Sequence, residues 1–170
     1  DVNAQSILIT DDRNLIKLVN ISLKKQLLEL PKKKIASQSI RNFGLAVLAK
    51  SKKRIIEIIN TIAPEHLELY TNYNKAIIKG VKNAGSIFLG KFSPEAIGDY
   101  IAGPNHVLPT TGSARFSSGL SVNDFLKRYS LIKITKTGIE RLGASVINLA
   151  KYENLEGHAN SVKIRLKKEN

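Results

Sequence analysis

The stretch LAVLAKSKKRIIEIINTIAPEHLELY, Leu45–Tyr70, decides the fold of this chain. It opens with a short apolar run, Leu45–Ala49, and closes with His66–Tyr70, in which polar and apolar residues alternate as they do in a β-strand. Between these runs, Lys52–Ile62 has the apolar period of a helix and stops before Pro64, which cannot continue one. A strand, a helix and a second strand in this order predict two parallel strands joined by a crossover helix.

The same alternation extends in both directions from this unit. Toward the N-terminus, the apolar run SILIT is followed by Asp11 and Asp12, which are suited to begin a helix, and Pro31 ends the helical period after them. The further expected elements are strands at Ser6–Thr10 and Ser86–Leu89 and helices at Arg13–Leu30, Lys32–Asn42 and Asn74–Val81. This alternation predicts an α/β fold with a mostly parallel sheet and flanking helices. Ligands of such sheets collect beyond the carboxyl ends of the strands.

The segment Pro94–Leu126, PEAIGDYIAGPNHVLPTTGSARFSSGLSVNDFL, differs from the rest of the chain in composition. It contains three of the five prolines, and Arg115 is its only lysine or arginine. Proline lacks a backbone donor and glycine costs backbone entropy, so a long helix is disfavoured here. The segment is also too polar for a core strand. We expect an ordered loop that carries side chains toward a ligand, although a plain surface connection would have the same composition.

After this loop the pattern changes again. Ser130–Thr135 is expected to be a strand, Gly138–Tyr152 is strongly helical, and Leu155–Leu166 is polar and amphipathic. Because this tail is too short to own a core, we expect it to pack on the sheet or on another chain. We therefore divide the sequence into an α/β domain at 1–118 and a helical appendage at 119–170 that packs on a partner subunit.

Charge and composition limit the classes of function. The 170 residues carry a formal net charge of +13 at pH 7, which would suit a nucleic acid ligand. The lysines are scattered rather than gathered into one stripe, and no zinc finger or aromatic RNA-binding motif accompanies them, so nucleic-acid binding is not expected.

The sequence also bears on compartment and completeness. Cysteine is absent, no apolar run is long enough for a membrane helix and no signal-peptide pattern opens the chain, so we expect cytoplasmic localisation and no membrane partner. There is no methionine and the first residue is Asp1, which we interpret as a sign that the chain is part of a longer protein.

Few side chains are suited to catalysis. The histidines are His66, His106 and His158, and a lone histidine is more often a structural hydrogen-bonding group than a catalyst. His66 directly follows Glu65 at a helix-to-strand turn, however, and a carboxylate next to an imidazole suits general acid/base chemistry. Asp99 and His158 could share a zinc ion only through the fold, and two ligands are too few for a stable site. No Walker lysine loop, G-x-S-x-G elbow or complete G-x-G-x-x-G indicates a local nucleotide site.

Three motifs resemble histidinol dehydrogenase. They are APEHLELYT at Ala63–Thr71, NAGSIFLG at Asn83–Gly90 and SPEAIGDYIAGPNHVLPTTGSARFSSGLSVNDFLKR at Ser93–Arg128. The third is highly specific to that family, and the resemblance covers essentially the whole chain, which matches the C-terminal part of the enzyme. It implies a partial Rossmann-like domain with a helical tail. The implied activity is the NAD- and zinc-dependent oxidation of L-histidinol through the aldehyde to L-histidine, the last step of histidine biosynthesis.

The resemblance also implies roles for single residues. Glu65 and His66 match the catalytic pair, in which His66 takes the proton of the alcohol and Glu65 helps to activate water for the second oxidation. Asp99 resembles a zinc ligand that also contacts the substrate, and His106 resembles a histidine of the substrate pocket.

The tail motif ENLEGH, residues 153–158, supplies the other implied residues. Glu153 and His158 match a carboxylate and a zinc-ligating histidine that reach into the neighbouring site of the family's homodimer. The implied substrate-binding residues are then His66, Asp99, His106, Glu153 and His158, and the implied zinc ligands are Asp99 and His158.

The remaining zinc ligands and the NAD-contacting residues of the family match no position here. We therefore expect the chain to be inactive without the missing N-terminal portion. Two other interpretations stay open: a non-catalytic relic acting as a basic binding or interaction module, and a nucleic-acid-binding domain that inherits the motif.

Overall fold

The computed structural model describes residues 1–167, which form two compact units. The first unit is Asp1–Phe125 and the second begins at Leu126, whereas the sequence-based division falls after residue 118. Residues beyond 118 are tied to the first unit by a backbone hydrogen bond, in which the N–H of Leu120 donates to the carbonyl of Val107 at 2.9 Å. Each unit is described by itself.

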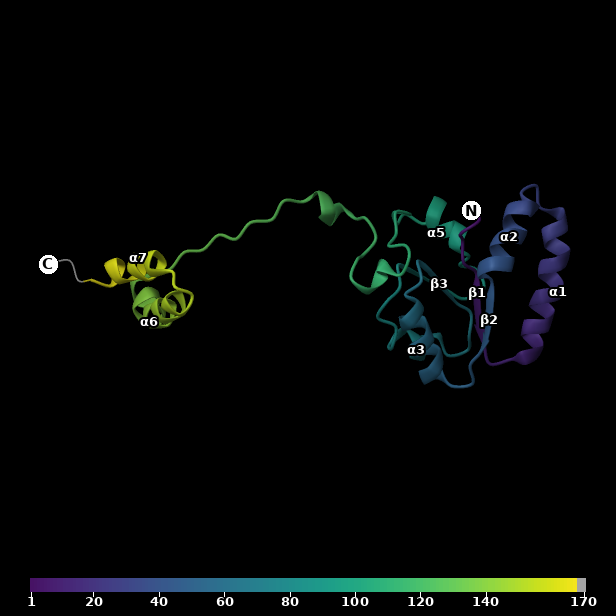
Figure 1. Cartoon of the computed structure of the whole chain (residues 1–170), viewed down its shortest axis with the longest axis horizontal. Coiled ribbons are helices and arrows are strands. Elements are labelled where there is room, and N and C mark those ends of the chain that lie inside the picture. The colour runs from purple at the N-terminus through teal and green to yellow at the C-terminus, as the bar shows by residue number, and fades with distance from the viewer. Residues whose placement is uncertain (168–170) are drawn as a thin grey trace. The chain divides into compact units, whose positions relative to one another are not determined.

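The first unit alternates strands and helices along the chain (Figure 1). Its elements are β1 (Ile7–Thr10), α1 (Arg13–Glu29), α2 (Lys33–Phe43), β2 (Leu45–Leu48), α3 (Lys52–Ile62), β3 (His66–Leu69), α4 (Asn74–Ile78), β4 (Ser86–Leu89) and α5 (Glu95–Tyr100). All of the expected strands and helices up to β4 are present, with ends that differ by a few residues.

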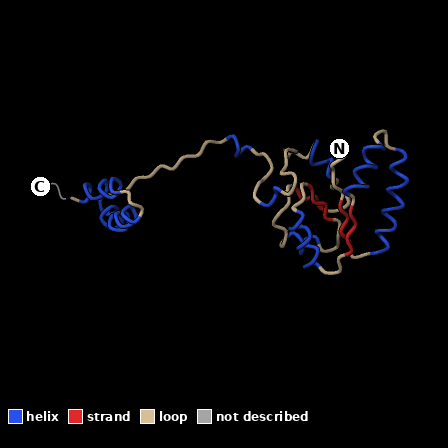
Figure 2. The backbone as a smooth tube through the Cα atoms, viewed as in Figure 1, coloured by secondary structure: helices blue, strands red, loops and turns tan. Residues whose placement is uncertain are grey.

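The strands are parallel, as the sequence predicts, and form two pairs rather than one continuous ladder (Figure 2). In the first pair β1 lies beside β2, with Ile7 opposite Leu45. In the second, β3 lies beside β4, with His66 opposite Ser86. The α/β class with parallel strands and flanking helices is therefore confirmed.

Local chemistry sets the ends of the helices. Asp12 caps α1 by accepting a hydrogen bond from the N–H of Asn14 at 2.7 Å, and Ser51 caps α3 by accepting from the N–H of Arg54 at 3.2 Å. At the other end of α3, Ala63 takes a left-handed conformation with φ of 51°. Pro64 then prevents the helix from resuming, so the chain turns into β3 at this point.

The core of the first unit lies among α3, β3 and α4. Ile59, Leu67 and Ile77 are among its buried side chains, and Ile77 is fully buried. By contrast, α1 contains no buried residue, and Figure 1 shows it on the opposite side of the unit from α3. The tightest packing therefore surrounds the turn that leads into β3.

The segment that was expected to be an ordered loop contains more regular structure than predicted. Pro94 precedes the short helix α5, and 3₁₀ turns occur at Ser113–Arg115 and Val122–Phe125. Gly98 costs helix propensity but lets α5 approach β4, because a Cβ on Gly98 would lie 2.5 Å from Cε1 of Phe88.

The second unit consists of two helices that pack on each other, α6 (Lys136–Tyr152) and α7 (Glu156–Leu166). The residues buried along these helices are small: Gly143, Ala150 and Ala159. A Cβ on Gly143 would lie 2.7 Å from Cδ1 of Leu166, so this glycine permits the close approach of the helices.

The prediction of a strand at Ser130–Thr135 was wrong. These residues are irregular, and the described strands pair only among themselves. The side chains of Leu131 and Ile132 are 91% and 77% exposed. An apolar, β-branched run satisfies the local preference for a strand, but a strand also needs a neighbour to accept its hydrogen bonds. Within residues 1–167 no helix is both long and apolar enough to cross a bilayer.

Candidate functional site

The turn between α3 and β3 carries Glu65 and His66 and is held from two sides. On the helix side, the N–H of Ala63 donates to the carbonyl of Ile59 at 2.9 Å. On the strand side, the N–H of Gly85 donates to the carbonyl of Pro64 at 2.9 Å, and the N–H of Ser86 donates to the carbonyl of Glu65 at 2.8 Å. Main-chain hydrogen bonds alone therefore fix the backbone on both sides of His66.

The helix α5 brings two carboxyl groups to His66. Asp99 Oδ1 lies 3.4 Å from His66 Nε2, and Glu95 Oε1 lies 3.8 Å from the same nitrogen. The two acids are one helical turn apart and therefore share one face of α5. The position of α5 is set in part by Glu68 on β3, whose Oε1 accepts the N–H of Glu95 at 2.9 Å.

The aromatic ring of Phe88 also lies near His66. The ring centroids of His66 and Phe88 are 6.0 Å apart, and the rings are tilted by 34°. Phe88 is also the side chain against which Gly98 packs. The imidazole thus lies between an apolar ring and two acids, and about a quarter of its side chain is exposed.

The electrostatics of this cluster are dominated by the two acids. A hydrogen bond with Asp99 raises the pKa of Glu95 above its ordinary value of 4.5, and burial and the charge of Asp99 raise that pKa further. The neighbouring His66 acts in the opposite direction. Folding therefore disfavours the ionised form of Glu95.

The same three side chains could hold a metal ion. One ligand atom from each of His66, Glu95 and Asp99 lies within 4.8 Å of the others, and all three residues are half-buried. An imidazole and carboxylates are donors that suit Zn²⁺. Sequence reasoning missed Glu95. Its spacing of four residues from Asp99 could have indicated it, had a helix been expected at that position.

The other predicted residues of the first unit lie around this cluster. Glu65 is half-buried in the turn, and His106 is exposed in the loop that follows α5. A pocket of about 340 Å³ lies between β4, α5 and that loop, and Phe88, Asp99 and Asn105 help to line it. Asp99 thus links this pocket to the cluster of two acids and an imidazole, and Asn105 links it to the neighbouring His106.

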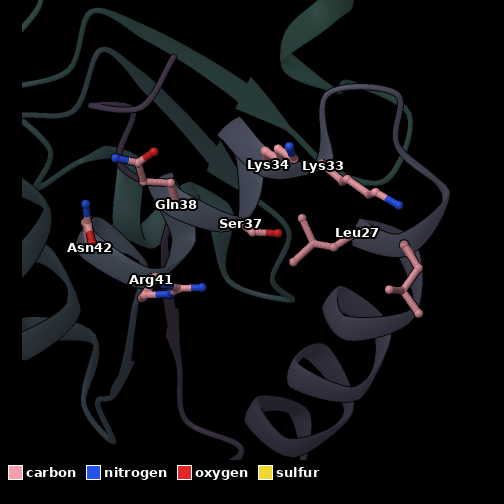
Figure 3. Close-up of a pocket in the computed structure, with 8 residues that line it drawn as sticks. Leu27, Lys33, Lys34, Ser37, Gln38, Arg41 and Asn42 are labelled. Atoms are coloured by element: carbon pink, nitrogen blue, oxygen red, sulfur yellow. The ribbon is translucent and has the colours of Figure 1, made fainter.

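A larger hollow of about 480 Å³ lies between α1 and α2 (Figure 3). Leu27, Lys33, Lys34 and Arg41 are among its lining residues. No carboxylate or imidazole lines it, so it lacks the groups for acid/base chemistry. The chemistry of this unit is therefore concentrated at the smaller pocket.

The last two predicted residues lie in the second unit. Glu153 follows α6, and His158 lies in the first turn of α7; both are exposed. The structure thus brings His66 and Asp99 together within the first unit and places Glu153 and His158 in the other unit.

The chain was compared with known proteins. The family model for histidinol dehydrogenase matches residues 1–166. The chain is 53% identical to histidinol dehydrogenase of Pelagibacter ubique, an alignment that covers 97% of this chain and 39% of that protein. It is 48% identical to histidinol dehydrogenase of Prochlorococcus marinus, over 97% of this chain and 38% of that protein.

A solved structure gives the same result. The crystal structure of histidinol dehydrogenase from Elizabethkingia anophelis matches this fold with a TM-score of 0.90 at 38% identity, over 97% of this chain and 38% of that one. The chain thus spans less than two fifths of the length of the relatives it matches. With a family model across nearly all of its residues and half-identical relatives, this chain belongs to the histidinol dehydrogenase family.

Proposed function

We propose that this chain supplies the acid/base residues and part of the metal site of an NAD- and zinc-dependent histidinol dehydrogenase, which oxidises L-histidinol through the aldehyde to L-histidine. The observation that carries the proposal is the placement of His66, with Nε2 3.4 Å from Asp99 Oδ1, at a rigid turn beside Glu65. A partly exposed imidazole beside a pocket is a suitable proton acceptor at neutral pH.

His66 is the main base in this proposal. It takes the hydroxyl proton of the alcohol while the hydride of the adjacent C–H bond leaves, which gives the aldehyde. In the second oxidation, Glu65 helps to remove a proton from the water that adds to the aldehyde carbon. That proton returns to the aldehyde oxygen to give the hydrate, which then loses a second hydride and a second proton to give the carboxylic acid. NAD⁺, when bound by residues outside this chain, would accept the hydride in both oxidations.

Zinc fits the donors present. Asp99 offers a carboxylate, and His158 offers an exposed imidazole on the second unit. When bound, Zn²⁺ would supply a Lewis acid that holds and polarises the substrate oxygen. His66 must stay free of the metal to act as a base, so Asp99 and His158 are the ligands proposed here. Two ligands are fewer than the four of a closed site, and the chain alone should bind Zn²⁺ weakly.

The partners follow from the same proposal. The missing N-terminal portion completes the NAD and zinc sites. A second copy of the enzyme receives the tail, so that Glu153 and His158 serve the neighbouring site while His106 contacts the substrate from the loop. The exposure of these three side chains supports contacts outside their own unit.

The test joins this chain to the N-terminal portion of the Pelagibacter ubique relative and compares variants of the chimera. His66→Asn should lower kcat by about 10²–10⁴-fold with little change in KM, because loss of a general base acts on the transition state. Glu65→Gln should impair oxidation of the aldehyde more than oxidation of the alcohol.

Feeding the aldehyde directly separates the two roles. If Glu65→Gln oxidised the aldehyde at the normal rate and failed on the alcohol, the division of roles between Glu65 and His66 would be wrong. If His66→Asn retained full activity with both substrates, His66 would not be the base.

A second candidate function, binding of a polyanion, is favoured by the basic hollow between α1 and α2. Lys33, Lys34 and Arg41 line that hollow, and the net charge is +13. Because the other lysines are scattered, binding to duplex DNA should be weak and lost by about 150 mM salt. Sub-micromolar binding that survives such salt would favour this candidate.

A further inference from the structure

Arg115, the only lysine or arginine of Pro94–Leu126, reaches back to the helix that precedes the catalytic turn. Its Nη2 donates to the carbonyl of Thr61, and its Nη1 donates to the carbonyl of Gly112 at 2.7 Å. Thr61 lies in the last turn of α3, where carbonyl groups lack partners within the helix. A cation is favoured at this end of a helix.

The same loop segment also contacts the strand side of the turn. Pro109 is buried, and its Cδ would lie 3.2 Å from a Cβ on Gly85. That same Cβ would lie 2.5 Å from the carbonyl oxygen of Glu65. Residues 109–115 therefore reach both sides of the turn: Arg115 donates to Thr61, and Pro109 lies beside Gly85, whose N–H donates to the carbonyl of Pro64.

The local backbone is shaped for this contact. Gly112 has a φ of +76°, and a Cβ there would collide with Nη1 of Arg115. Ser113 closes the preceding bend by donating from its N–H and its hydroxyl to the carbonyl of Thr110, at 3.0 and 2.6 Å. The guanidinium serves two acceptors at once, which the point charge of a lysine cannot do with the same geometry.

We propose that Arg115 is a positioning residue: it holds the turn bearing Glu65 and His66 in register with the loop that carries His106. The inference rests on the proposed function for its catalytic consequence. A displacement of about 1 Å in a catalytic group can cost about 10²-fold in rate, so a clamp outside the pocket can affect chemistry.

The first test is hydrogen exchange on the 170-residue chain. The amides of Gly85 and Ser86 donate to the two carbonyls of the turn, and the amide of Ala49 donates to Thr10 far from it. Arg115→Ala should speed exchange at Gly85 and Ser86 by about tenfold or more and leave Ala49 unchanged, since only local opening is affected.

A matched control is Arg54→Ala, which removes an exposed arginine from the first turn of the same helix, where its guanidinium pairs with Glu57. It should leave Gly85 and Ser86 unchanged. Equal acceleration at Ala49 in Arg115→Ala, or no acceleration anywhere, would overturn the inference.

The second test measures kinetics in the chimera. Arg115→Ala should lower kcat by about 10–10²-fold with KM changed less than twofold, and millimolar guanidinium should restore part of kcat. The same salt should not restore His66→Asn. A loss confined to KM, or no rescue, would contradict the positioning role.

Arg115→Lys covers the case in which the alanine variant does not fold. Arg115→Lys keeps the positive charge but removes the planar guanidinium that donates to two carbonyl groups. This variant should therefore speed hydrogen exchange at Ser86 and lower kcat. Wild-type values for both would overturn the inference. If the parent chimera is inactive, the proposed function fails, and hydrogen exchange alone still decides whether Arg115 holds the turn.

Discussion

The two units of this chain differ in what they bury. The first buries large aliphatic side chains, such as Ile59, Leu67 and Ile77, around one turn. The second buries only small residues along its helices and leaves Leu149 and Ile164 65% exposed. Burial of large apolar side chains supplies most of the stability of a fold. The first unit can therefore fix the side chains of its candidate site, whereas the second carries Glu153 and His158 on a scaffold with little core.

This difference explains which predicted residues the structure brings together. His66 and Asp99 are far apart in sequence but meet because α5 packs through Gly98 on Phe88 of β4, the strand that pairs with β3. His158 lies on a two-helix unit that leaves apolar side chains such as Leu149 and Ile164 exposed. The proposed metal site thus has two parts. Asp99 lies in the unit that has a core of large side chains, and His158 lies in the unit that has little core.

The largest expected effect comes from the core of the first unit. Ile77→Ala should lower the free energy of unfolding by about 2–5 kcal/mol, because Ile77 is fully buried and its truncation leaves a cavity. Ile164→Ala, the same change at a 65% exposed position of the second unit, should cost less than about 0.5 kcal/mol. Urea unfolding followed by circular dichroism measures both. Equal losses would show that the two units do not differ as described.

A smaller effect is expected where α6 and α7 meet. Ala159 is fully buried there, so Ala159→Leu should overpack the contact and destabilise the second unit by about 1–3 kcal/mol. Gly157→Ala is the matched control on the same helix, because no atom lies within 4 Å of its Cβ position. It should stabilise α7 by up to about 1 kcal/mol. Hydrogen exchange in α7 reports both changes, and slower exchange in Ala159→Leu would refute the packing argument.

The acid pair of the first unit should lower stability at neutral pH. The pKa of Glu95 is raised in the folded chain, so its ionised form is disfavoured by folding; the cost is full above the folded pKa and absent below the ordinary value of 4.5. Glu95→Gln should therefore raise the free energy of unfolding at pH 7 by less than about 1 kcal/mol, after allowance for screening of this 43% exposed side chain.

The pH dependence provides the check on Glu95. The gain from Glu95→Gln should disappear when unfolding is measured at pH values below the ordinary pKa of a glutamate. A loss of stability at pH 7, or a gain that persists in acid, would show that the raised pKa of Glu95, caused first by its hydrogen bond with Asp99, is not the source of the effect.

The smallest effect is expected in the second unit. Lys163 Nζ lies 2.8 Å from Glu156 Oε1, and this contact lowers the pKa of Glu156 below 4.5. The stabilisation is therefore present above pH 4.5 and lost as the pH falls through the folded pKa. Glu156→Gln should slightly reduce the helicity of α7 at neutral pH, less so in high salt. Lys163→Gln should have the same effect. In the double variant the two losses should not add, and additive losses would contradict the pairing.

Much of the first unit could be predicted from short stretches of sequence. The caps Asp12 and Ser51, the stop at Pro64 and the apolar period of α3 each act within one or two helical turns, so they can be recognised without knowing the fold. The strand expected at Ser130–Thr135 failed for the complementary reason, because its apolar pattern is local but its hydrogen-bonding partner is not. The short helix α5 was missed because Gly98 disfavours a helix locally, and packing of this glycine on Phe88 compensates.

The sequence by itself determined the α/β pattern and the family resemblance, and it indicated Glu65 and His66 as the candidate acid/base pair, because each depends on neighbouring residues. Only the tertiary structure decided that Glu95 joins Asp99 at His66 and that Arg115 reaches Thr61. The physical reason is distance along the chain. Contacts between residues 29 to 54 positions apart depend on how whole elements pack, and no local period or spacing encodes that packing.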